Sequence, residues 1–100
     1  MSKLDKISEE AVRWYQLAAE QGNAFAQTSL GLMYRHGLGV VQDYVEANRW
    51  FRLAAEQRYA PAQHSLGLMY ANGEGVAQDD AEADRWFRLA DEDEDEDEED

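Results

Sequence analysis

The sequence contains no cysteine, so disulfide bonds and thiolate metal sites are excluded. No apolar run approaches the roughly 20 residues that a membrane-spanning helix needs, so we expect no membrane segment and no membrane partner. The first ten residues, MSKLDKISEE, carry lysines without a following apolar core, which does not resemble a signal peptide. Together these absences predict a cytoplasmic protein.

Basic residues are also scarce. The chain has 9 Lys and Arg against 22 Asp and Glu, which gives a net charge of −13. Ten of the acids fill residues 91–100, and residues 1–90 hold 12 acidic and 9 basic residues. Because binding to a phosphate backbone requires a basic stripe, we expect no nucleic-acid partner.

The dominant feature that is present is an internal repeat. The hexapeptide SLGLMY occupies residues 29–34 and returns unchanged at residues 65–70. Residues 11–46 and 47–82 are identical at 23 of 36 positions. A fixed period of this size predicts an array of units that bury their apolar faces by stacking on one another.

A tryptophan marks the same position of each copy. The three tryptophans and the aromatic residues that follow them are Trp14, Trp50, Trp86, Tyr15, Phe51 and Phe87. An aromatic pair in every unit predicts a core between helices. Trp50 has repeats on both sides, so we expect it to be the most buried tryptophan. Trp86 and Phe87 lie on the last, shortened helix, where we expect an open apolar end.

Helical periodicity and capping residues predict an all-α chain of about five helices. The predicted helices are residues 3–21, 24–36, 44–57, 60–72 and 80–90. Asn23 is placed to cap the second helix, and Gly37 is placed to end it. Asp43 and Glu46 have the spacing of a capping box before the third helix. Arg58 stands where Gly22 stood one repeat earlier, so a shared turn geometry requires positive φ at Arg58.

Several motifs indicate structure rather than chemistry. Gly31 and Gly67 lie inside helices, where we expect them to permit the close approach of a neighbouring helix. The glycine pairs in residues 37–39 and 73–75 lack the strand and lysine of a phosphate-binding loop. The two histidines stand at different levels of their helices, without cysteine, so we expect no metal and no cofactor. No serine or carboxylate has a recognisable catalytic arrangement, and we predict a non-enzyme.

The motifs LGLMY, GxGVxQD and RWFRLAAEQ, in two copies or close variants, resemble the Sel1-like repeat family, relatives of the tetratricopeptide repeats. The resemblance covers about residues 8–90. It implies a right-handed α-solenoid of antiparallel helix pairs that binds proteins or peptides as a scaffold, often in bacteria. On this basis we assign residues 1–22 to an N-terminal capping helix, 23–58 to a first repeat, 59–90 to a truncated second repeat and 91–100 to an acidic disordered tail.

The acidic tail has three interpretations. It is a disordered solubilising segment, an engineered addition that begins abruptly inside a repeat, or an arm that binds a basic partner or weakly collects Ca²⁺. Carboxylates at a helix C-terminus oppose the macrodipole, so we expect the tail not to extend the fifth helix.

Differences between the two LGLMY helices suggest where a partner binds. By resemblance to tetratricopeptide arrays, the face of these helices that is free of stacking lines a concave groove. The candidate partner-binding residues are Phe25, Thr28, Leu32, Arg35, His36, Pro61, His64, Leu68 and Asn72. This mixture suits a protein or peptide with some acidic character. The alternatives are a merely solvated face, or a structural unit that self-associates as a homo-oligomer through exposed array ends.

Overall fold

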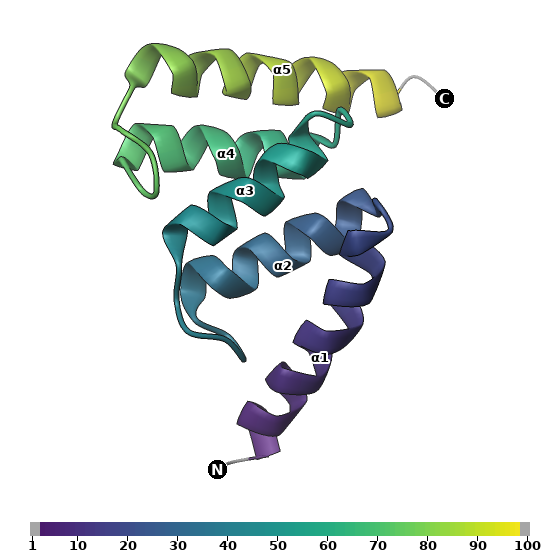
Figure 1. Cartoon of the computed structure of the whole chain (residues 1–100). Coiled ribbons are helices and arrows are strands. Elements are labelled where there is room, and N and C mark those ends of the chain that lie inside the picture. Colours follow the sequence, from purple (N-terminus) through teal and green to yellow (C-terminus); the bar gives the residue numbers. More distant parts are fainter. Residues whose placement is uncertain (1–2, 99–100) are drawn as a thin grey trace.

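The computed structural model describes residues 3–98, and within that range the chain forms five α-helices and no strand. The helices are α1 (Lys3–Glu20), α2 (Ala24–His36), α3 (Tyr44–Ala55), α4 (Ala60–Asn72) and α5 (Asp80–Glu98). Figure 1 shows α1 at one end of the array and α5 at the other. The expected all-α fold is confirmed for this part of the chain. Residues 1–2 and 99–100, which we assigned to the first segment and to the tail, lie outside the described residues.

Local capping chemistry sets most helix boundaries. The side-chain oxygen of Asn23 accepts a hydrogen bond from the Ala26 N–H at 2.8 Å and begins α2. Gly37 and Gly73 end α2 and α4 with φ values of 70° and 67°, a region that glycine enters without a steric penalty. Arg58 has a φ of 65°, which confirms the positive φ expected from its place in the repeat.

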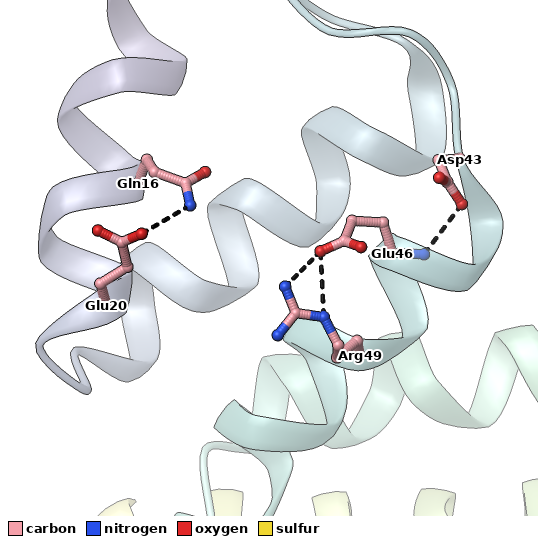
Figure 2. A network of polar contacts seen from close by, with 5 residues as sticks. All are labelled: Gln16, Glu20, Asp43, Glu46 and Arg49. Carbon is pink, nitrogen blue, oxygen red and sulfur yellow. Dashed lines mark hydrogen bonds and ion pairs between the residues drawn. The ribbon is translucent and has the colours of Figure 1, made fainter.

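The expected capping box at the start of α3 is only half formed. The Asp43 carboxylate accepts a hydrogen bond from the Glu46 N–H at 3.0 Å, and the same cap recurs at Asp79. The reciprocal half of a capping box is replaced by other contacts. The Asp43 N–H donates to the Tyr34 carbonyl at 2.8 Å. The Glu46 carboxylate accepts from Arg49, as Figure 2 shows. The cap therefore also ties the loop back to α2.

Each buried tryptophan packs against the two helices that precede it. Trp50 on α3 is 4% exposed, and Trp86 on α5 is 6% exposed. The buried residues clustered with Trp50 are Ala19, Ala26 and Leu30. The cluster around Trp86 contains their counterparts one repeat later: Ala55, Ala62 and Leu66. The core is thus one packing pattern used twice.

The helical glycines permit an aromatic ring to reach the helix backbone. A Cβ atom added to Gly31 would lie 2.6 Å from the Phe51 ring, and one added to Gly67 would lie 2.6 Å from the Phe87 ring. Both distances are shorter than any ordinary contact. The interpretation of these glycines as packing residues is therefore confirmed, and it locates the close approach between the two helices of one repeat.

The expected open apolar end at Trp86 and the expected core position of Trp14 are both wrong. Trp86 is buried rather than open, because α3 and α4 cover it. Trp14 is the exposed tryptophan, with 74% of its surface accessible. Trp50 is the most buried of the three, as expected. Since Trp50 and Trp86 are each covered by the helices that precede them, the apolar end within residues 3–98 is the outer face of α1.

The acidic segment also departs from expectation, because α5 continues through it to Glu98 instead of ending at Ala90. One carboxylate anchors the extension. The buried side chain of Asp93 accepts hydrogen bonds from the Arg58 guanidinium at 2.8 Å and from Gln63 Nε2 at 2.8 Å. These contacts outweigh the unfavourable macrodipole that argued for an early stop. Residues 91–98 are therefore a helix, not a disordered tail.

The anchor follows the register of the repeat. One repeat earlier, Gln57 Nε2 donates to Gln27 Oε1 at 2.9 Å. Asp93 and Gln63 stand thirty-six residues after this pair, so the same two positions bond again with reversed donor and acceptor. Arg58, which replaces the glycine of the earlier repeat, supplies the positive charge that an aspartate needs there.

Burial alone would raise the pKa of the Asp93 carboxyl. The hydrogen bonds from Arg58 and Gln63, together with the Arg58 charge, outweigh burial and hold that pKa below its usual range. The charged carboxylate therefore contributes its full stability above its unfolded pKa of about 4. That contribution is lost as the pH falls through the lower folded value.

Replacing Asp93 with asparagine is expected to reduce the free energy of unfolding by about 1 kcal/mol at pH 7, since charge-assisted bonds become neutral ones and Arg58 is largely exposed. The difference between wild type and Asp93→Asn should shrink as the pH falls below about 4. Urea denaturation across pH measures it. Glu92→Gln on the exposed side of α5 is the control, and an equal loss there would remove the special role of Asp93.

Candidate functional site

The predicted binding residues lie on α2 and α4, which also contact each other directly. The structure divides them by exposure. The exposed members are Phe25, Leu32, His36, Pro61, His64 and Asn72. Leu68 and Arg35 are half-buried, and Thr28 is buried. The predicted set is therefore not one uniform surface.

Thr28 does not fit the proposed surface. Its hydroxyl donates a hydrogen bond to the Ala24 carbonyl at 2.8 Å, and the residue is buried. His64 stands at the same repeat position and is exposed, but its ring lies 5.2 Å from the Phe87 ring of α5. This position therefore faces the partner helix of its own repeat, and divergence between the copies does not mark it as part of a groove.

Arg35 is not a free cation. Its guanidinium donates a hydrogen bond to the Glu74 carboxylate at 3.0 Å, and both side chains are half-buried. The ion pair joins the end of α2 to the loop before α5, which lies in the next repeat. Arg35 therefore holds neighbouring repeats together, and the expected preference for an acidic partner loses its support.

The accessible residues of α2 form a strip at helical spacing. Its members are Phe25, Ser29, Leu32 and His36, separated by four, three and four residues. The matching residues of α4 are Pro61, Ser65, Leu68 and Asn72. We call these eight residues the A-helix strip. The sequence analysis did not single out the two serines, which are identical in the two copies, although helical spacing from Phe25 would have found them.

Apolar and polar residues alternate along the A-helix strip. Leu32 and Leu68 occupy equivalent central positions, with a serine hydroxyl one turn before each. Phe25 is exposed and meets the Tyr15 ring of α1 edge-on at 6.2 Å. No carboxylate, lysine or arginine belongs to the strip. Such a surface can pack against apolar side chains and form a few hydrogen bonds.

The described side chains give no indication of a metal centre. No group of three or more His, Asp or Glu residues among them is placed to hold an ion. None of the helices in residues 3–98 combines the length and apolar character needed to cross a bilayer.

The chain matches the family described as Sel1 repeat over residues 8–23, 24–59 and 60–90. Among solved structures, it is similar to a Sel1 repeat protein from Oxalobacter formigenes, with 45% identity and a TM-score of 0.81 over 85% of this chain and 35% of that one. It is also similar to c5321, a protective antigen of uropathogenic Escherichia coli strains displaying an SLR fold. There the identity is 45% and the TM-score 0.83, over 84% of this chain and 18% of that one.

Both similarities support the helical repeat solenoid expected from the sequence. The chain spans about a third of the length of the first protein and less than a fifth of the second. A comparison with curated proteins finds no match. The similarity therefore concerns the repeat unit and its fold, and the roles of the larger proteins do not transfer with it.

Proposed function

The chain belongs to the Sel1 repeat family, and we propose that it is a non-enzymatic module that binds a protein or peptide along the A-helix strip. Sel1 repeats commonly act as scaffolds for interactions between proteins. The observation that carries the proposal is the exposed apolar surface of Phe25 and Leu32 on α2, next to the half-buried Leu68 of the adjacent helix α4. A cytoplasmic location and the absence of nucleic-acid partners stay predictions from the composition.

The strip favours a partner with an apolar side. Leu32 and Phe25 leave apolar surface uncovered, and the flanking serines can bond to a peptide backbone or to polar side chains. An amphipathic helix presents apolar residues at the same three- and four-residue spacing, so it can lie along such a surface. Because Arg35 is already paired with Glu74, charge contributes little to the choice of partner.

Selection of a random peptide library on the folded chain tests this proposal. Enriched peptides are expected to bind wild type and to lose about tenfold or more in affinity on Leu32→Asp, which is about 1.4 kcal/mol. Val41→Asp is the matched control, because Val41 is an equally apolar, exposed residue in the loop before α3. Binding that survives Leu32→Asp and fails on Val41→Asp would move the site to that loop.

A further inference from the structure

The outer face of α1 is a second apolar surface, separate from the A-helix strip. Ile7, Trp14 and Leu17 are all exposed there, at spacings of seven and three residues. Glu10 lies on the same seam between Ile7 and Trp14, and Arg13 lies beside it; with Trp14 and Leu17 these two residues line a shallow hollow of about 420 Å³. These spacings place the side chains along one seam of the helix.

The repeat itself shows what this face is suited to. At the two equivalent positions the tryptophan is covered by other helices, so that Trp50 is 4% and Trp86 6% exposed, against 74% for Trp14. A clustered, rimmed apolar patch of this kind marks an interaction site. The tryptophan position is therefore built to receive helices, and at α1 it does not receive them from residues 3–98.

We propose that the α1 face binds the α1 face of a second copy of this chain, with the two helices antiparallel about a two-fold axis near residue 12. In that arrangement Ile7 of each copy lies opposite Leu17 of the other, and Trp14 packs beside Glu10. Each pairing occurs twice because the interface is isologous. The proposal goes beyond partner binding at the A-helix strip and uses none of its residues.

The alternative head-to-tail stack has no matching surface on α5. The surface that covers Trp50 includes Ala19 near the end of α1, followed by a turn into α2. Asp91 stands at the corresponding position of α5, is exposed, and is followed by helix instead of a turn. Because α5 continues as a helix where α1 turns into α2, it does not reproduce the surface that covers Trp50, which disfavours burying Trp14 of another copy there.

The distribution of charge between α1 and α5 also favours pairing through α1. Residues 3–20 contain three basic and four acidic residues, whereas α5 carries eleven acids and two arginines. Figure 1 places α5 at the far end of the array from α1. An α1 dimer therefore keeps the two acidic helices apart, and it brings Glu10 of each copy within reach of Arg13 of the other.

Sedimentation of the whole chain between about 1 μM and about 1 mM tests the proposal. We expect a reversible dimer, and we expect Leu17→Glu to weaken it at least about tenfold without changing the helical circular dichroism. Leu53→Glu is the control, because Leu53 is an exposed leucine at the same repeat position on α3. A wild type that remains monomeric, or a dimer lost on Leu53→Glu and retained on Leu17→Glu, overturns the proposal.

Mixing two charge variants tests the two-fold geometry. In Glu10→Arg, residues 10 and 13 are both basic, and in Arg13→Glu they are both acidic. Like charges then meet across the two-fold axis, so each variant alone should be mostly monomeric. The mixture should form heterodimers, because every close pair across the axis then joins opposite charges. If the mixture stays as monomeric as its parts, these residues do not meet across an interface and the antiparallel arrangement is wrong.

Discussion

Replacing Trp50 with alanine is expected to reduce the free energy of unfolding by about 3–5 kcal/mol, the usual cost of emptying a buried tryptophan site. Trp50 of α3 clusters with Ala19 of α1 and with Ala26 and Leu30 of α2, and it is 4% exposed. A domain of this size has only about 5–15 kcal/mol in total, so the variant should lose a large fraction of its stability. Urea denaturation followed by circular dichroism measures the loss.

Trp14 provides the control within the same chain. It has the same residue type and repeat position as Trp50 but is 74% exposed, so Trp14→Ala should change stability by no more than about 0.5 kcal/mol at concentrations where the chain is monomeric. Trp86 is nearly as buried as Trp50, and its alanine variant should resemble Trp50→Ala. Equal losses at Trp14 and Trp50 would show that the first helix packs differently.

A smaller change at the same site separates volume from polarity. Among the described residues, the Trp50 Nε1 donor is buried without an acceptor. Phenylalanine removes that unsatisfied donor while retaining much of the apolar volume, so Trp50→Phe should cost much less than Trp50→Ala.

The sequence predicts the helices well because the signals that begin and end them are local. The bounds of α2 and α4 agree with the predicted residues, since Asn23, Gly37 and Gly73 act on groups within a few residues of themselves. The 36-residue period likewise identifies the repeat, and the positive φ of Arg58 follows from comparing two copies.

The errors arise where a residue depends on a distant one. Trp14 and Trp50 are indistinguishable in pattern, and only the presence of a preceding helix decides which is buried. Whether the acidic segment continues α5 depends on Arg58, which lies thirty-five residues before Asp93. Hydrophobic periodicity cannot identify such partners, because it describes one helix at a time and not the contacts between helices.

The candidate site shows the same limit. Divergence between the copies directed the prediction to α2 and α4, but it included Arg35, whose partner Glu74 is thirty-nine residues away. It did not single out Ser29, which is identical in the two copies. Exposure depends on three-dimensional neighbours, so a comparison of two copies cannot identify the exposed face of a helix.

Replacing Gly31 with alanine is expected to destabilise the protein, although alanine is the better helix former by roughly 1 kcal/mol. The added methyl would lie 2.6 Å from Cε1 and 2.7 Å from Cδ1 of Phe51, whose ring is fully buried and cannot move aside freely. Overpacking of this kind typically costs about 1–3 kcal/mol. We therefore expect a net loss of about 1–2 kcal/mol in urea denaturation.

Gly67 tests the reason for that loss. Its added Cβ would meet the Phe87 ring at the same 2.6 Å, but Phe87 is only half-buried and its ring has more room to shift. Gly67→Ala should therefore cost less than Gly31→Ala.

In a Phe51→Leu background the ring is gone, so Gly31→Ala should become neutral or stabilising, and the double-mutant cycle should show a coupling of about 1 kcal/mol or more. If Gly31→Ala costs as much without the ring as with it, the glycine serves another contact and the close approach of α2 and α3 does not explain it.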